Sequence, residues 1–87
     1  DPKILFKELA LLKVVGTSKN LDKAKKLCKK YNGVILDKTK KSFVIQVTAL
    51  RREIDKLTVT LKPLGLISVS RTGAVAMTKG KETFIQN

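Results

Sequence analysis

The 87-residue sequence contains no histidine or tryptophan, and it has a single cysteine, Cys28. Histidine is the commonest general base and the commonest metal ligand, so its absence removes the usual Ser-His-Asp and Cys-His pairs. One cysteine excludes an intramolecular disulfide and a cysteine-based metal cluster. The sequence also lacks a glycine-rich phosphate loop and any metal-ligand spacing. These absences favour a binding or regulatory domain with no cofactor of its own over an enzyme.

Long hydrophobic runs are absent as well. No apolar stretch reaches the roughly 18 residues that would span a membrane, so we expect no membrane partner. The N-terminus has no signal-peptide pattern, and the low cysteine content fits a reducing, cytoplasmic location. The length predicts one domain over residues 1–87, with a polar tail from Lys81 to Asn87.

Positive charge is abundant, and the formal net charge of +12 raises the hypothesis of nucleic-acid binding. However, lysine supplies 16 of the 19 positive charges, and arginine, the better reader of bases and phosphates, supplies only three. The lysines are scattered, and aromatic residues make up 5% of the chain, so stacking platforms are scarce. A basic nucleic-acid-binding module is therefore the alternative interpretation and not the preferred one.

Hydrophobic periodicity predicts a mixed chain of strands and helices. Leu21, Ala24 and Cys28 share one stripe of a helix, so Cys28 is expected to be a core residue and not a reactive thiol. The predicted elements are a strand from Glu8 to Val15, a helix from Leu21 to Tyr31, strands from Val34 to Lys38 and from Ser42 to Val47, a helix from Leu50 to Leu61, and a strand after Gly65.

Local signals set the expected ends of the two helices. Asn20 is the expected N-cap of the first helix, and Gly33 is expected to end it as a residue of left-handed conformation. Pro63 and Gly65 are expected to stop the second helix. Lys38, Lys40 and Lys41 crowd the turn between the two middle strands, where they form either a solvated loop or an anion site.

The closing stretch, Gly65 to Gly80, is the most distinctive part of the sequence. Arg71-Thr72-Gly73 interrupts its run of β-branched residues, so we expect either one strand with a bulge and a tail or two short strands that meet at this corner, the second from Ala74 to Met77. The corner holds a permanently charged side chain on a fixed backbone. Arg71 is then either an internal tie that fixes the turn or a contact residue for a partner, together with Thr72 and Gly73.

The order of elements is the β-α-β-β-α-β pattern of an α+β, ferredoxin-like sandwich, with a short extra C-terminal strand. In this fold two helices cover one face of the sheet. The first strand nevertheless has apolar residues on both faces, so the face away from the helices needs another cover. We expect a homo-oligomer or another subunit to supply it. The candidate contact residues are Leu9, Ala10, Leu11, Leu12 and Val44, because the sequence does not tell which parity faces outward.

Three segments resemble the C-terminal domain of the acetolactate synthase (acetohydroxyacid synthase) small, regulatory subunit. The first is Glu8-Leu9-Ala10-Leu11-Leu12-Lys13-Val14, and the second comprises Asp37, Ser42 and Val47-Thr48. The third comprises Ile54-Asp55-Lys56-Leu57, then Pro63-Leu64-Gly65-Leu66, and then Arg71-Thr72-Gly73-Ala74-Val75-Ala76-Met77 with Gly80. Their order and spacing extend over some 75 residues. The chain departs from the family pattern at Lys7 and Lys79, where arginine is usual, at Gln46 and Ser68, where glutamate is usual, and at Ala49, where glycine is usual.

The resemblance implies an ACT-related, ferredoxin-like fold and a regulatory role in the biosynthesis of valine and isoleucine. In that family the small subunit has no activity of its own and stimulates a catalytic, large subunit that carries thiamine diphosphate, FAD and magnesium. The family's N-terminal ACT domain, which binds the feedback effector, has no counterpart among these residues. A third, weaker hypothesis is an amino-acid-binding, ACT-like dimer.

Overall fold

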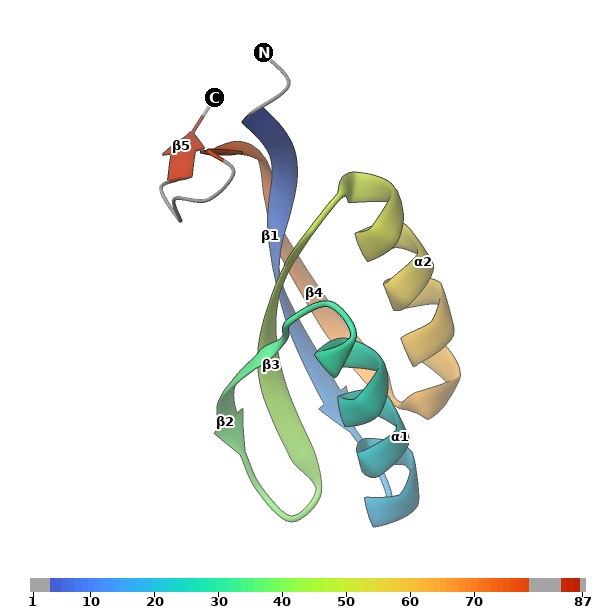
Figure 1. Cartoon of the computed structure of the whole chain (residues 1–87). Helices are drawn as coiled ribbons and strands as arrows, with labels where there is room; N and C mark the ends of the chain where they lie inside the picture. The colour runs from blue at the N-terminus through green and yellow to red at the C-terminus, as the bar shows by residue number, and fades with distance from the viewer. Residues whose placement is uncertain (1–3, 79–83, 87) are drawn as a thin grey trace.

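The computed structural model describes residues 4–78 and 84–86, and it describes side chains for residues 7–72. In the described chain, five strands form one sheet with the order β2-β3-β1-β4-β5, and every pair of neighbours is antiparallel. Both α-helices lie on the same side of this sheet (Figure 1). The elements are β1 (Ile4–Val15), α1 (Ser18–Lys29), β2 (Val34–Lys38), β3 (Ser42–Ala49), α2 (Arg51–Leu61), a 3₁₀ helix (Lys62–Leu64), β4 (Leu66–Thr78) and β5 (Phe84–Gln86). The α+β, ferredoxin-like prediction is confirmed.

The core lies between the helices and one face of the sheet, and simple periodicities build it. On β3, buried residues alternate with partly exposed ones along the whole strand. On α1, Leu21, Ala24 and Cys28 face inward, as the helical stripe predicts. The core comprises Ala10, Leu12, Val14, Leu21, Ala24, Cys28, Phe43, Ile45, Val47, Ala49, Ile54, Leu57 and Leu61.

The first helix begins earlier than the sequence predicts. Thr17, and not Asn20, is its N-cap: the Thr17 hydroxyl accepts a hydrogen bond from the Asn20 backbone N–H at 3.2 Å. Threonine and asparagine are both good caps, so residue type alone does not distinguish them. The helix therefore gains most of one turn at its N-terminus relative to the prediction.

The end of the first helix also differs in mechanism from the prediction. Asn32 takes the left-handed conformation, with φ of 56°, whereas Gly33 does not have a positive φ. Gly33 is required for space, because a Cβ there would lie 2.6 Å from Ile45 Cδ1 and 2.9 Å from the Cys28 carbonyl oxygen. The chain thus enters β2 directly beneath a core isoleucine, and a side chain at this position would push the two elements apart.

The second helix is bounded at its start by a carboxylate and at its end by a glycine. The Glu53 carboxylate accepts a hydrogen bond from the Leu50 backbone N–H at 2.9 Å, which satisfies a donor at the helix start. Gly65 follows the 3₁₀ helix with φ of 108°, and a Cβ there would lie 1.9 Å from the Val15 carbonyl oxygen. Only glycine combines this φ with so close an approach, so the predicted stop at Gly65 is confirmed.

The closing stretch is one continuous strand with a bulge, so the first alternative is confirmed and the alternative of two short strands meeting at a corner is wrong. β4 pairs with β1 from Leu66 to Thr78. Between the pairs Ala10–Arg71 and Glu8–Ala74, β4 has one residue more than β1. The interruption at Thr72-Gly73 is therefore a β-bulge, which bends the strand without ending it.

The C-terminal segment also differs from the prediction. The extra short strand is β5, which pairs with β4 through Val75–Gln86, Ala76–Ile85 and Met77–Phe84. The segment from Ala74 to Met77, predicted to be that strand, belongs to β4. Within the predicted polar tail from Lys81 to Asn87, residues 84–86 form β5. The remaining residues of the tail lie outside the described residues.

Candidate functional site

Arg71 joins three elements at the bulge end of the sheet. Its Nε donates a hydrogen bond to the Glu8 carboxylate of β1 at 2.9 Å, and its Nη2 also contacts the same oxygen. Its Nη1 donates to the Asp55 carboxylate of α2 at 2.6 Å, and Nη2 donates to the Arg51 carbonyl oxygen at 3.3 Å. All three guanidinium nitrogens are therefore engaged within the chain, which supports the internal-tie interpretation of Arg71.

Burial distinguishes the two carboxylates in this cluster. The Glu8 side chain is 11% exposed and the Asp55 side chain is 57% exposed. A carboxylate with little exposed area depends on its charged partner, whereas an exposed ion pair is screened by water. The hydrogen bonds of Asp55 and of Glu8 raise the pKa of Arg71 further above its ordinary value, in that order of importance. We therefore expect the contact between Arg71 and Glu8 to stabilise the fold more than the contact between Arg71 and Asp55.

Thr72 and Gly73 form the bulge next to Arg71. Both residues oppose Leu9, and the Thr72 hydroxyl donates a hydrogen bond to the Leu9 carbonyl oxygen at 3.3 Å. Arg71 precedes the bulge and pairs with Ala10, which is buried under the helices, so its side chain lies on the helix side of the sheet, where Asp55 is found. Thr72 is exposed.

The second candidate surface is the sheet face opposite the helices, which we call the open face. The β1 and β3 registers place Leu9, Leu11, Lys13 and Val15 of β1 beside Thr48, Gln46, Val44 and Ser42 of β3. Leu11 is 36% exposed, Val15 is 37% exposed, and Val34, opposite Gln46 on β2, is 54% exposed. The open face is therefore a mixture of apolar and polar side chains in the middle of the sheet.

The structure divides the predicted contact residues of β1 between the two faces. Leu9 and Leu11 lie on the open face with Val44, whereas Ala10 and Leu12 have no exposed area and lie in the core. Ala10 and Leu12 were candidates only because the parity of the strand was unknown. Their burial under the helices removes them as contact residues.

The described residues offer no catalytic or metal-binding cluster. No group of three or more His, Cys, Asp or Glu residues among them is arranged to hold a metal ion. Cys28 is fully buried, and this burial raises the pKa of its thiol to about 11, which makes it a poor nucleophile. No helix in the described part of the chain is long and apolar enough to cross a membrane.

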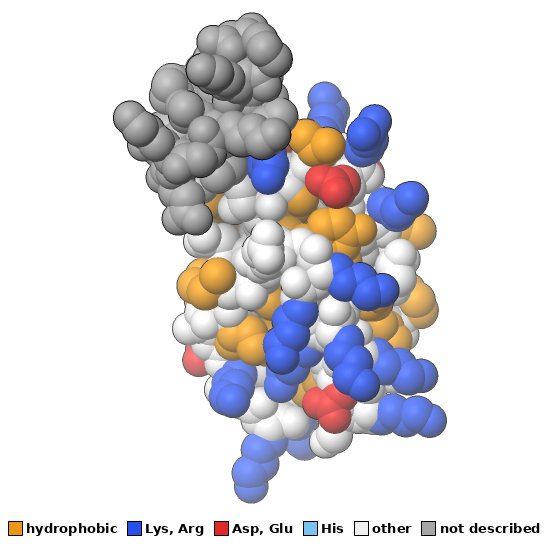
Figure 2. Space-filling view, viewed as in Figure 1, with side chains coloured by type: hydrophobic (Ala, Val, Ile, Leu, Met, Phe, Trp, Pro, Cys, Tyr) orange, Lys and Arg blue, Asp and Glu red, His pale blue; other side chains and the backbone are white. Residues whose placement is uncertain are grey.

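Basic side chains are spread over the surface and are not confined to one stripe. On the face seen in Figure 2 they lie over both helices and over the strands, with few acidic groups among them. This distribution matches the scattered lysines of the sequence.

Glu8 and Asp55 are the functional neighbours of Arg71 that sequence reasoning missed. Each is separated from Arg71 by many residues, 63 for Glu8 and 16 for Asp55. Once the ferredoxin-like topology is assumed, the antiparallel pairing of β1 with β4 brings Glu8 near Arg71. The α2 contact has no such signal, because it depends on how the helix packs.

The antiparallel sheet and the two helices on one of its faces define a ferredoxin-like, ACT-related domain. The chain belongs to the acetolactate synthase small subunit family, since the model of the family described as "Small subunit of acetolactate synthase" matches residues 7–80. The role that this family name carries is that of a regulatory subunit, in a pathway of branched-chain amino-acid biosynthesis.

Individual relatives agree with this assignment. The chain is 32% identical over 79 residues to the acetolactate synthase small subunit of Bacillus subtilis, covering 91% of this chain and 46% of that protein. It is 33% identical over 72 residues to the small subunit of Aquifex aeolicus, covering 82% of this chain and 38% of that protein. The chain thus spans about half, or less, of the length of these relatives.

A solved structure supports the fold. The crystal structure of the acetolactate synthase small subunit from Thermotoga maritima superposes with a TM-score of 0.74 at 24% identity. The superposition covers 92% of this chain and 49% of that chain.

Proposed function

We propose that this chain acts as the regulatory C-terminal domain of an acetolactate synthase small subunit, and that it binds the catalytic subunit and raises its activity. The family assignment supports the partner. Thiamine diphosphate, FAD and magnesium would then reside on the catalytic subunit, and the chain, a single domain over residues 1–87, would work beside it in the cytoplasm. On its own the chain would not convert pyruvate to acetolactate.

The open face is the surface that we assign to this contact. The single observation that carries the assignment is the exposure of Leu11 and Val15 on β1, the central strand of the sheet, more than a third each. Apolar side chains grouped among polar ones on an otherwise charged surface are typical of protein-interaction sites. Arg71 is the weaker candidate, because its hydrogen-bonding groups are already occupied within the chain.

The test is to add the chain to its cognate catalytic subunit and to measure acetolactate formation from pyruvate. The wild-type chain should raise the rate, and a double variant of the open face, Leu11→Ser with Val44→Ser, should lose most of that increase.

The matched control is Val59→Ser on α2. Val59 is 69% exposed, more than Leu11, but it lies on a helix and away from the open face. This variant should activate as well as the wild type. Equal loss of activation in both variants, or full activation by the double variant at normal stability, would contradict the assignment.

Self-association through the same face is the second candidate, since a second copy could cover the same apolar residues. Light scattering of the chain alone tests it: a dimer that Leu11→Ser dissociates supports it. A monomer at high micromolar concentration would contradict self-association, and the open face would then remain available for the catalytic subunit.

A further inference from the structure

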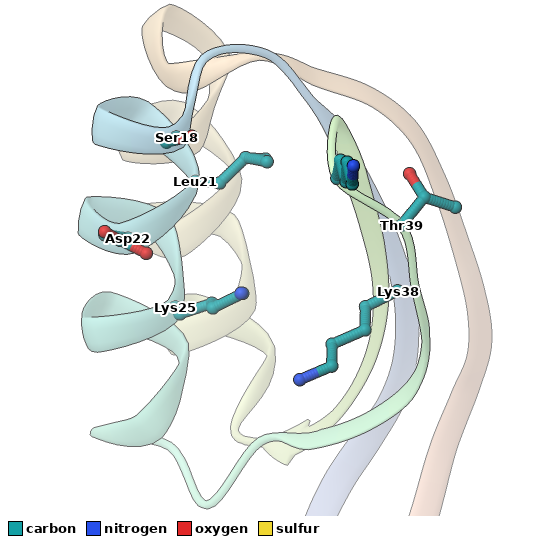
Figure 3. A pocket seen from close by; sticks show the side chains of 7 residues that line it. Ser18, Leu21, Asp22, Lys25, Lys38 and Thr39 are labelled. Atoms are coloured by element: carbon teal, nitrogen blue, oxygen red, sulfur yellow. The ribbon is translucent and has the colours of Figure 1, made fainter.

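A cleft between α1 and the turn that joins β2 to β3 is lined by three lysine side chains. The cleft has a volume of about 610 Å³, and its lining residues are Ser18, Leu21, Asp22, Lys25, Lys38, Thr39 and Lys40. Figure 3 shows Lys25 reaching into this space from α1 and Lys38 reaching into it from the opposite side. Three lysines and one carboxylate therefore border one hollow.

These lysines have no anionic partner within the described residues. The ion pairs found there all belong to Arg71, at the other end of the helix layer, and none involves Lys25, Lys38 or Lys40. Like charges that converge without a counter-ion repel each other, and a concave wall concentrates their field. A bound anion would therefore reduce the repulsion between the ammonium groups of the cleft.

Lys25 is held in place and is not a freely moving surface side chain. Its Nζ lies 5.8 Å from the centre of the Phe43 ring, within the range of a cation–π contact. Phe43 is 1% exposed, so its ring is a fixed part of the core and offers no stacking surface to a base. One positive charge of the cleft is therefore pre-positioned, which reduces the ordering needed to bind a ligand.

Hydroxyl groups and a second hollow extend the site. Ser18 and Thr39 line the cleft, and the Thr39 hydroxyl already accepts a hydrogen bond from the Lys41 backbone N–H at 3.1 Å. That bond fixes the turn that carries Lys40 and Lys41. A neighbouring hollow shares Ser18 and Lys40 and adds Lys41, so positive charge continues along the turn.

We propose that this cleft, which we call the lysine cleft, binds the phosphate groups of a small organic phosphate or polyphosphate. The volume lies within the range of small-molecule sites, and the separated ammonium groups match a ligand with two or more phosphate charges. None of the residues that line the cleft is aromatic, which argues that the phosphates, and not a base, are recognised. The site lies apart from both Arg71 and the open face, so it is independent of the proposed subunit contact.

The experiment is a calorimetric titration of the chain with inorganic pyrophosphate at about 0.1 M salt, where surface charges further apart than roughly 10 Å are screened. We expect saturable binding with a Kd of about 1 mM or tighter. The amide signals of residues 38–41 should shift during a parallel nuclear magnetic resonance titration. No saturation up to about ten times that concentration would overturn the proposal.

A charge-matched pair of variants separates a site from diffuse charge. Lys38→Gln with Lys40→Gln should weaken pyrophosphate binding about tenfold, because charge-assisted contacts are lost. Lys56→Gln with Lys62→Gln removes the same charge from exposed positions on α2 and the 3₁₀ helix and should change the Kd less than twofold. Equal weakening by the two pairs would show that only net charge matters and would overturn the proposal.

Nucleic acid is the competing ligand with the same chemistry. A 12-nucleotide single strand should bind with strong salt dependence and should lose similar affinity in both variant pairs, since scattered lysines contact a long backbone. If the single strand depended on Lys38 and Lys40 and pyrophosphate did not, the cleft would be part of a nucleic-acid surface and the proposal would be wrong. Melting temperatures of all variants should match the wild type, because the substituted side chains are exposed.

Discussion

Leu11 and Leu12 are neighbours on β1, yet they lie in different environments. Leu12 has no exposed area under the helices, whereas Leu11 is 36% exposed on the open face. The helix-covered face contains almost only apolar residues, and the open face mixes them with Lys13, Gln46 and serine. The comparison shows that one strand can contribute to the stability of the fold with one face while its other face remains available for a partner.

The largest expected difference between the two faces is in stability. Leu12→Ala should lower the free energy of unfolding by about 2–5 kcal/mol, because it leaves a cavity in a packed core. Leu11→Ala, the same change one residue earlier, should lower it by less than about 1 kcal/mol, since its side chain is already partly in water. Urea unfolding of both variants measures the difference. Similar losses would mean that the open face is packed in the isolated chain.

The Arg71 cluster sharpens the same comparison at the edge of the core. Arg71→Ala should lower the free energy of unfolding by roughly 2–3 kcal/mol, mainly because Glu8 would keep a nearly buried charge without its partner. Asp55→Asn should lower it by less than about 1 kcal/mol, because that carboxylate is 57% exposed. Denaturant titration of both variants, with activation of the catalytic subunit as a second measurement, tests this order. Loss of activation by Arg71→Ala at unchanged stability would instead assign Arg71 to the partner contact.

The pH dependence of stability tests whether the thiol of Cys28 is shielded from water under the helices. The folded chain holds the pKa of Cys28 at about 11, above the ordinary value of 9.0, because burial disfavours the thiolate. Well below pH 9 the thiol is neutral in both states and this contribution is complete. As the pH rises towards 11 the unfolded chain ionises first, so roughly 2–3 kcal/mol of stability should be lost. Cys28→Ala should remove this additional loss, and unfolding curves at pH 8 and pH 10.5 measure it. An identical pH dependence in the variant would mean that the thiol is hydrated.

The smallest expected effect on stability belongs to the open face itself. Leu11→Ser should change the free energy of unfolding by less than about 1 kcal/mol in the monomer, in contrast to any change at Leu12. If the chain self-associates, the Leu11→Ser substitution should weaken the dimer, as measured by sedimentation or light scattering. A variant that is strongly destabilised yet still dimeric would show that the two faces are not separable in this way.

The sequence predicted most of the architecture, because strong periodicity fixes which face of each element is apolar. The helical stripe with Leu21, Ala24 and Cys28 and the alternation along β3 correctly predicted a helix and a strand of the α+β fold. The helix start at Thr17 was missed, since several adjacent residues are competent caps. The left-handed conformation was predicted for Gly33 and belongs to Asn32. Gly33 is needed for its small size, and its close approach to Ile45 cannot be deduced without the packing.

Candidate contact residues were less predictable than the fold. The period-2 pattern of β1 is apolar on both faces, so sequence alone could not choose between Leu11 and Leu12. The partners of Arg71 are distant in sequence, and the sequence left open whether the interruption beside it is a bulge or the end of a strand. Glycine after a charged residue signals a break in the regular ladder, but its outcome depends on whether the neighbouring strand continues. Here β1 continues to Ile4, so β4 continues beside it.

The two irregular positions of β4 have a consequence for the length of the chain. Between Lys13–Ser68 and Val14–Leu66, and again between Ala10–Arg71 and Glu8–Ala74, β4 carries one residue that β1 does not match. Elsewhere in the strand, the loss of one residue would turn every following side chain to the wrong face. At Ile67, or at Thr72 or Gly73, the loss of one residue would leave the pairs on both sides in step. Natural variation in the length of this strand is therefore expected to concentrate at these two places.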